Sequence, residues 1–369
     1  MADFLEERCP LIYSVIMAGG KGERFWPLSN ESRPKQLLSI TDDKCMLEVT
    51  IKRIDEFIPI EHTVVVAGEN IKDAILVRCP LIKEENMLCE PSGRNTCLAI
   101  GYAAVHLQKR DPEGIMVVLS ADHLIQPAEK LIATIRAGTK IAAKQDNLIT
   151  IGIVPSRAET AYGYIELSDE KYEVDGISVC KVSAFKEKPR PTVAQQYYYG
   201  RKHLWNSGMF IWSVSSILKA FEKHMPEMHQ QLMEYSRHIG KSSEKKTRKK
   251  LYDDAEPVSI DIAILEQADN VLTLQGKFTW DDIGSWLALQ RFKNTDKENN
   301  VVIGKAVLAG TFESTIVNDT GGLVATLGVS DLVVVRTGDV VLVAHKTHLD
   351  KIKGLLDKIA SDEDLRKFL

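Results

Sequence analysis

The chain has 369 residues, of which 44% are hydrophobic and 27% are charged. These proportions are typical of a globular protein and exclude a disordered or fibrous chain, while the length predicts about two domains. A formal net charge of −4 argues against a surface that coats nucleic acid or adsorbs to a membrane, although it leaves room for a local basic pocket that binds an anion.

Nothing in the sequence indicates membrane insertion or secretion. The longest stretch without Asp, Glu, Lys or Arg runs from His203 to Leu218 and is shorter than the ~20 apolar residues of a bilayer span. The segment Met1–Arg8 contains three acidic residues and lacks the basic-then-apolar start of a signal peptide. The six cysteines show no CxxC pair and no metal-finger spacing, which favours reduced, buried thiols. We therefore expect a cytoplasmic protein with no membrane or nucleic-acid partner.

Short strands rich in Val and Ile alternate with helical patterns in the first part of the chain. The expected strands are Ser14–Ala18, Thr63–Ala67, Ile115–Ser120 and Leu148–Ile153, and the expected helices are Met46–Phe57, Ile71–Arg78, Thr96–Arg110 and Ala128–Lys144. This alternation is typical of a doubly wound, Rossmann-like α/β sheet, whose ligands bind beyond the carboxyl ends of the strands.

The pattern changes after Thr160. Longer β-like stretches follow at Gly163–Leu167, Ser178–Lys186 and Ser207–Ser213, and helices are expected from Ser215 to Ala255. A β insertion followed by helices is consistent with a sugar-binding half added to a nucleotide-binding half.

A second change occurs in the polar stretch Asn294–Asn300. We therefore expect a catalytic domain over residues 1–297 and a small β domain over residues 298–369. From Val301 to Ala344, short apolar strands alternate with turn residues, which predicts an all-β unit stacked in short coils, and Thr347–Ile359 has the apolar spacing of an amphipathic helix.

This small C-terminal unit cannot bury much apolar surface alone. The apolar runs Val333–Val335 and Val340–Val343, and one face of the terminal helix, must therefore be covered by something. A second copy of the chain is the commonest solution, so we expect a homodimer with an interface near residues 320–345.

The most informative segment is Met17–Leu38, MAGGKGERFWPLSNESRPKQLL, which follows the first expected strand. Gly19, Gly20 and Gly22 lie where α/β folds bind phosphates, and glycines let backbone N–H groups approach oxygen anions. The segment matches neither a P-loop nor GxGxxG, because Phe25 stands where the third glycine would be.

Two cations follow these glycines. Arg24 comes two residues after Gly22, and Lys35 comes directly after Pro34. Cations that converge on a glycine turn suit a triphosphate, since a guanidinium can bridge two phosphate oxygens.

These residues begin a series of motifs that resembles the sugar nucleotidyltransferases, and specifically the mannose-1-phosphate guanylyltransferases. The seven motifs, in order, are GGKGERFWPLS with RPKQ, EP with RNT, SADH, YGYI, FKEKP, WNSG and WDDIGSW. The resemblance implies transfer of GMP from GTP to mannose 1-phosphate, giving GDP-mannose and pyrophosphate. It also implies a mixed Rossmann-like sheet and a short left-handed β-helix that joins two subunits.

The resemblance assigns metal and phosphate roles. Asp122 and Asp282 would hold a divalent cation, usually Mg²⁺, with Asp281 as an alternative to its neighbour. Without the resemblance, Asp122 could be a helix cap and Asp282 an exposed turn residue. Arg24 and Lys35 would neutralise the triphosphate.

The resemblance also assigns residues that contact the sugar phosphate. Lys188 would hold its phosphate, and Gly163, Glu187 and Asn206 would contact the hexose hydroxyls. The alternative for Lys188 is a surface ion pair with Glu187.

Glu90 is the candidate for base recognition. Guanine offers two adjacent donors, N1–H and the 2-amino group, and a carboxylate can accept both. Glu90 begins EPSGRNT, and Arg94, Asn95 and Thr96 would shape the same pocket. The alternative is that Glu90 caps the helix that begins near Thr96.

The chain departs from the family pattern at Cys97-Leu98, where Ala-Pro is usual, and at Lys186, where Val is common. Residues 298–369 are too few for the cupin domain of the bifunctional relatives, so isomerase activity is not expected. Two rival functions remain: the same chemistry on another hexose 1-phosphate or nucleotide, and a silent regulatory subunit that binds sugar nucleotide. A silent subunit is free to lose the residues of the reaction, and all of these are present: Arg24, Lys35, Asp122, Lys188 and Asp282.

Overall fold

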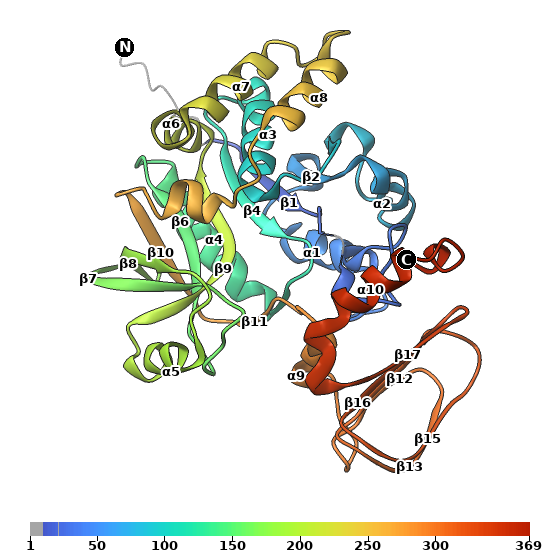
Figure 1. Ribbon diagram of the computed structural model, residues 1–369. Helices are drawn as coiled ribbons and strands as arrows, with labels where there is room; N and C mark the ends of the chain where they lie inside the picture. Colours follow the sequence, from blue (N-terminus) through green and yellow to red (C-terminus); the bar gives the residue numbers. More distant parts are fainter. Residues whose placement is uncertain (1–9, 21) are drawn as a thin grey trace, which may run out of the picture.

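The computed structural model describes residues 10–20 and 22–369 (Figure 1). The prediction about Met1–Arg8 lies outside these residues. Within them, one large mixed sheet runs through the first part of the chain, and a smaller β unit follows at the C-terminus. The confirmed fold class is therefore α/β with a C-terminal β domain.

The large sheet has nine strands in the order β3-β2-β1-β4-β9-β6-β10-β8-β7. Their bounds are β1 Ile12–Met17, β2 Thr63–Gly68, β3 Met87–Glu90, β4 Ile115–Ser120, β6 Leu148–Ile153, β7 Tyr164–Val174, β8 Ile177–Lys186, β9 His203–Ser213 and β10 Val271–Gly276. The first four strands of the order are parallel. Strands β1, β2 and β4 were predicted, whereas β3 was not. A separate short pair joins β5 (Leu124–Gln126) to β11 (Thr279–Asp281).

Strand β9 lies in the middle of the sheet, antiparallel to both β4 and β6. The stretches assigned to a separate sugar-binding half therefore extend the nucleotide-binding sheet. The order of strands along the chain does not predict this arrangement. Strand β9 follows the β7–β8 hairpin in the sequence, but it lies between β4 and β6 in the sheet, whereas the hairpin forms the far edge.

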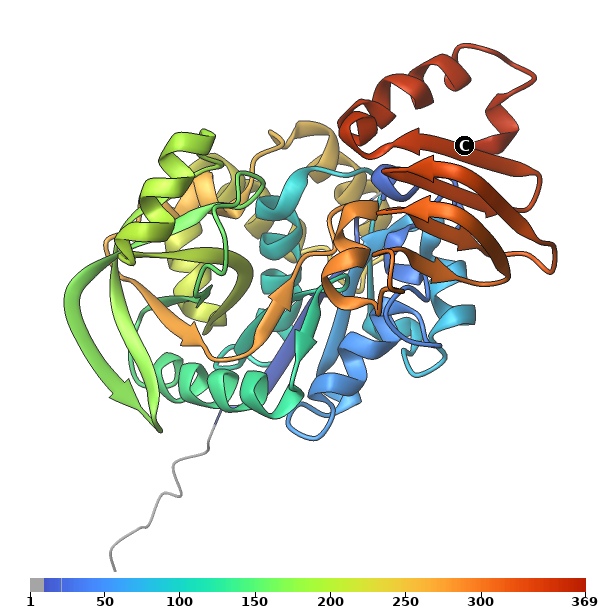
Figure 2. The ribbon, with the colours of Figure 1, turned by 90° about the horizontal axis from the view of Figure 1, so that it is seen from below.

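Helices cover both faces of the sheet (Figures 1 and 2). They are α1 Met46–Ile54, α2 Lys72–Arg78, α3 Asn95–Arg110, α4 Ala128–Ala142, α5 Pro191–Gly200, α6 Val214–His224, α7 Pro226–Ser236 and α8 Glu244–Asp254. The short helix α9, Leu289–Phe292, packs instead against the C-terminal unit. Alternation along β2 shows the two faces: Val64 and Val66 pack with α3, whereas Val65 packs with α1 and α2. None of the helices in residues 10–20 and 22–369 is long and apolar enough to cross a membrane.

The C-terminal unit is a stack of short strands: β12 Val301–Ile303, β13 Ala306–Phe312, β14 Thr315–Asn318, β15 Val324–Ser330, β16 Leu332–Thr337 and β17 Val340–His345. Strands β12, β14 and β16 form one parallel sheet, and β13 and β15 form another, so successive turns of chain stack on each other. Strand β17 turns back antiparallel to β16. The expected terminal helix begins as a 3₁₀ segment, Lys346–Lys351, and continues as α10, Ile352–Ala360.

The apolar face of this unit is covered by the same chain. Val333, Val335 and Leu342 share a hydrophobic cluster with Phe25 and Trp286 of the first domain. The C-terminal segment lies against the N-terminal part of the chain in both views (Figures 1 and 2). The burial argument for a second subunit was therefore wrong for these residues, because the intramolecular contact already removes them from water.

Candidate active site

In the loop after β1, the glycine segment that leads to Arg24 packs against the segment that carries Lys35, and the contact is at Gly22. This glycine has φ 69°, in the left-handed region, and a Cβ there would lie 2.7 Å from Lys35 Cβ and 2.8 Å from the Lys35 backbone nitrogen. Only a residue without a side chain allows both the turn and this close approach. Gly22 therefore holds the segment of Lys35 against the glycine loop.

A cavity of about 580 Å³ opens at the carboxyl ends of β1, β3 and β4. It is lined by all the residues predicted to bind nucleotide and by one of the two predicted metal ligands. These lining residues are Gly19, Gly20, Gly22, Arg24, Lys35, Glu90, Arg94, Asn95, Thr96 and Asp122. The cavity thus lies where the alternation of strands and helices predicts a ligand.

Lys35 links the two predicted metal ligands. Its buried ammonium group donates to Asp122 Oδ2 at 2.5 Å and to the backbone oxygen of Asp282 at 2.7 Å. Burial works to raise the pKa of Asp122, but the charges of Lys35 and His123 and the hydrogen bonds to the carboxylate together outweigh it, so the pKa lies below its usual range. Asp122 is therefore an anion, and a cation already faces it.

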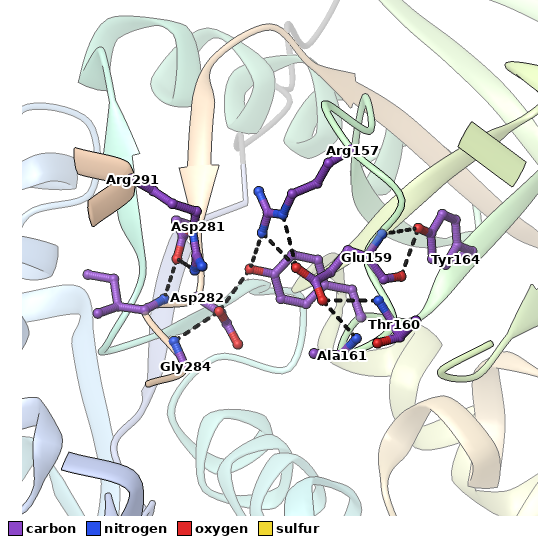
Figure 3. A network of polar contacts seen from close by, with 11 residues as sticks. Arg157, Glu159, Thr160, Ala161, Tyr164, Asp281, Asp282, Gly284 and Arg291 are labelled. Atoms are coloured by element: carbon purple, nitrogen blue, oxygen red, sulfur yellow. Dashed lines mark hydrogen bonds and ion pairs between the residues drawn. The ribbon is translucent and has the colours of Figure 1, made fainter. Parts of the chain in front are cut away.

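The neighbouring carboxylates Asp281 and Asp282 face different partners (Figure 3). Asp281 accepts from Arg291 Nε at 2.5 Å, from Arg291 Nη2 at 2.7 Å and from the backbone N–H of Ile283 at 2.8 Å. Asp282 Oδ1 accepts from the Tyr162 hydroxyl at 2.9 Å and from the backbone N–H of Gly284 at 3.0 Å. Both carboxylate oxygens of Asp281 thus already accept hydrogen bonds from Arg291, and one of them also accepts from the backbone of the turn.

The carboxylate of Asp282 lies beside the cavity. A Cβ at Gly284, which lines the cavity, would lie 2.9 Å from Asp282 Oδ2 and 3.3 Å from Arg24 Nη1. The absence of a side chain at Gly284 therefore leaves room for the carboxylate and the guanidinium to face the same space. No group of three or more His, Cys, Asp or Glu side chains suited to a metal occurs within residues 10–20 and 22–369.

Glu90 ends β3 with a buried carboxylate that lines the cavity. Tyr252 donates its hydroxyl to Glu90 Oε1 at 3.2 Å. Burial raises the pKa of Glu90 to about 7, although the bond from Tyr252 acts in the opposite direction. Helix α3 begins at Asn95 without a side-chain cap, so the alternative that Glu90 caps this helix is wrong.

Arg94 and Thr96 of the EPSGRNT segment form hydrogen bonds with the chain in and after α8. Arg94 Nε donates to the backbone oxygen of Tyr252 at 2.6 Å. Thr96 Oγ1 accepts from the backbone N–H of Ile260 at 3.0 Å, and Asn95 has a positive φ of 65° and accepts from the N–H of Thr96. Tyr252 thus supports both Glu90 and Arg94.

Three of the predicted sugar-binding residues lie together, outside the residues that line the cavity. A Cβ at Gly163 would lie 3.2 Å from Glu187 Oε2 and 3.7 Å from Asn206 Cβ. The amide of Asn206 donates to Asp261 Oδ1 at 2.7 Å. Burial raises the pKa of Asp261, and the charge of Glu187 adds to the effect.

Lys188 does not line the cavity. Its side chain is 63% exposed and forms an ion pair with Glu187, which is the surface arrangement considered as the alternative. A phosphate contact from Lys188 therefore requires that its side chain leave Glu187.

Three residues that contact the site were not among the predicted ones: Tyr162, Tyr252 and Asp261. Tyr162 stands in the YGYI motif beside Gly163, so its position carried a signal. Tyr252 and Asp261 lie in segments without a recognisable motif, and only folding brings them to Glu90 and Asn206.

Comparisons with known proteins identify the family of this chain. Residues 13–299 match the family described as Nucleotidyl transferase, and residues 304–359 match the MannoseP isomerase/GMP-like beta-helix domain. An Escherichia coli protein named mannose-1-phosphate guanylyltransferase is 32% identical over 355 residues, which cover 95% of this chain and 76% of that protein. A Salmonella typhimurium protein named mannose-1-phosphate guanylyltransferase RfbM is 34% identical over 354 residues, which cover 95% of this chain and 72% of that protein.

A solved structure shares the complete architecture. A Thermus thermophilus protein, described as a mannose-1-phosphate geranyltransferase, superposes with a TM-score of 0.85 at 32% identity. The match covers 95% of this chain and 99% of that structure. The expectation of a nucleotidyltransferase enzyme is thereby confirmed, and the chain belongs to the mannose-1-phosphate guanylyltransferase family.

Proposed function

We propose that this enzyme converts GTP and mannose 1-phosphate to GDP-mannose and pyrophosphate. An oxygen of the sugar phosphate attacks the α-phosphorus of GTP, a new P–O bond forms, and the bond to the β-phosphate breaks. The single observation that carries this proposal is the cavity that holds Arg24, Lys35, Glu90 and Asp122 together in a chain of this family.

The barrier of such a reaction is mainly electrostatic, because two polyanions must meet. Arg24 and Lys35 border the glycine loop from the side of the cavity and would neutralise the triphosphate. Arg24 would lie nearest to the leaving pyrophosphate. Backbone N–H groups at Gly19 and Gly20 would donate further hydrogen bonds to the phosphate oxygens without adding a charged side chain.

The donor set fits a hard divalent cation such as Mg²⁺. Asp122 and Asp282 supply carboxylate oxygens at the cavity, and Mg²⁺ commonly uses one or two carboxylates with water and phosphate oxygens. When bound, the cation would offset the charge that builds up on the phosphates. Asp281 is the weaker candidate, because Arg291 and a backbone N–H occupy its oxygens.

The mannose would bind between the cavity and β9. Asn206, Glu187 and the backbone at Gly163 are close enough to share one hexose, and Lys188 would turn from Glu187 to its phosphate. Polar groups of this kind reject a sugar that lacks the matching hydroxyl, because a partner is left unpaired.

We also propose that the protein is a cytoplasmic homodimer. The five cysteines among residues 10–20 and 22–369 are buried free thiols, which suits a reducing compartment. Large apolar side chains are exposed on the outer strands of the C-terminal unit, including Val307 (58%), Leu327 (82%) and Val343 (61%). A twofold contact through these strands would remove them from water.

The reaction is tested by measuring pyrophosphate release from four nucleoside triphosphates, each combined with several hexose 1-phosphates and Mg²⁺. We expect the highest kcat/KM with GTP and mannose 1-phosphate. A higher value for another pair would assign the enzyme a different substrate, and no release with any pair would favour a silent binding subunit.

The metal ligands are tested by comparing Asp282→Asn with Asp281→Asn. We expect Asp282→Asn to lower turnover by orders of magnitude with little change in the free energy of unfolding. Asp281→Asn should instead destabilise the fold by about 1.5–3 kcal/mol, because it weakens charged hydrogen bonds with Arg291. Asp122→Asn should lower turnover to a similar extent, but it should also destabilise the fold, because it removes the carboxylate partner of the buried Lys35 ammonium. Normal turnover in Asp282→Asn with a well-folded, inactive Asp281→Asn would transfer the role to Asp281.

The base contact is tested by the pH dependence of GTP binding. The pKa of Glu90 is about 7 without ligand, and guanine donors require the ionised carboxylate. GTP binding should therefore release a proton from Glu90 below about pH 7, and its affinity should rise between pH 6 and 8. Calorimetry should show that Glu90→Gln lacks this component and binds GTP about 1–3 kcal/mol less tightly. The γ-phosphate of GTP titrates in the same way with the unmodified protein and with Glu90→Gln. Identical pH profiles of GTP affinity for the two proteins would therefore show that Glu90 does not contact the guanine base.

The oligomeric state is tested by light scattering of the full chain at micromolar concentration. We expect twice the 41.3 kDa mass of one chain. Leu327→Glu should shift the equilibrium toward the monomer, because it places a charge in the apolar contact. A monomer mass for the unmodified protein would contradict the homodimer.

A further inference from the structure

The segment between β6 and β7 reaches the metal side of the active site through Tyr162. Figure 3 shows this segment, with Arg157, Glu159 and the backbone of Thr160 and Ala161, beside the loop that carries Asp282. The Tyr162 hydroxyl donates to Asp282 Oδ1 at 2.9 Å, across 120 positions of sequence. Tyr162 also directly precedes Gly163, which lies against the predicted sugar-binding residues.

The ring of Tyr162 is fixed by its neighbours. It is buried, and it packs edge-on against Trp205 and Trp280 with centroid distances of 5.2 and 4.9 Å. The Arg157 guanidinium lies 5.7 Å from its centroid and 5.0 Å from that of Trp205. Side chains that are locked in this way can hold a hydrogen-bond partner in one orientation.

The phenol of Tyr162 is a donor throughout the ordinary pH range. Burial raises its pKa, and the negative charge of Asp282 raises it further. In the bond between them, the hydroxyl is the donor and the Asp282 carboxylate oxygen is the acceptor.

This hydrogen bond makes the two oxygens of Asp282 unequal. Oδ1 accepts from both Tyr162 and the N–H of Gly284. Oδ2 has no hydrogen bond or ion pair within the described part of the chain, and it lies next to Gly284 at the cavity. Because Oδ1 already accepts two hydrogen bonds, Oδ2 is the oxygen left to face a cation.

We propose that Tyr162 is a positioning residue for the metal site: its hydroxyl fixes the Asp282 carboxylate with Oδ2 toward the cation. This inference rests on the proposed function, in which Asp282 is a metal ligand. Hydrogen bonds from groups behind a ligand typically change metal affinity by about 10–100-fold. Because Tyr162 adjoins Gly163, the same short segment contacts Asp282 and would also contact the sugar.

Tyr164 offers a matched control on the same segment. Its hydroxyl donates to the Glu159 backbone oxygen at 2.9 Å and accepts from the Glu159 N–H at 3.0 Å. Tyr164→Phe therefore removes one hydroxyl from a buried tyrosine and weakens the segment, but it leaves the bond to Asp282 in place.

The experiment measures Mn²⁺ binding to the full chain, without nucleotide, by electron paramagnetic resonance. We expect wild type and Tyr164→Phe to bind with similar affinity, Tyr162→Phe to bind about 10–100-fold more weakly, and Asp282→Asn to lose the site. In turnover assays, excess Mg²⁺ should restore kcat of Tyr162→Phe, which a general folding defect would not allow. Thermal unfolding of each variant reports the fold separately.

Two results would overturn the inference, and they differ from each other. If wild type binds Mn²⁺ through Asp282 and Tyr162→Phe binds equally well, or if Tyr164→Phe loses as much affinity, the specific hydroxyl has no positioning role. If wild type shows no Mn²⁺ site that Asp282→Asn removes, the proposed metal ligand fails, and the role of Tyr162 fails with it.

Discussion

The active site depends on the buried ammonium group of Lys35. It joins the Asp122 carboxylate, at the end of β4, to the backbone of Asp282, which lies far along the chain. Removing a cation from water is costly, so the protein must supply anionic or dipolar partners. Those partners are the carboxylate of Asp122 and the backbone oxygen of Asp282, and both residues are predicted metal ligands. Lys35 thereby holds the site together before any substrate or cation arrives.

The C-terminal unit supports the opposite side of the same loop. Phe25 and Trp26 directly follow Arg24. Their side chains pack in one cluster with the strands β12, β14 and β16 and with α10. The Trp26 indole also donates to the backbone oxygen of Phe368 at 2.8 Å. The glycine loop is thus held between the sheet and the C-terminal unit, so a change in that unit can reach Arg24 without any contact with substrate.

The parts predictable from the sequence are those specified by local residues. Periodicity located β1, β2 and β4, and the glycines located the loop, so Arg24, Lys35 and Asp122 were expected at one edge. The position of β9 was not accessible, because strand order depends on contacts between distant segments. Tyr252 and Asp261 were missed for the same reason. Lys188 was assigned by its motif, yet its contact with Glu187 depends on a side-chain rotamer that no motif specifies.

The most direct test is a crystal structure of the full chain with GDP-mannose and Mg²⁺. We predict that guanine N1–H and the 2-amino group contact Glu90, that Asp122 and Asp282 Oδ2 hold the cation, and that the Lys35 ammonium has moved from Asp122 toward the diphosphate. The mannose should lie against Gly163 and Asn206. A nucleotide bound outside the cavity, or a cation held by Asp281 with Lys35 still on Asp122, would contradict this description of the site.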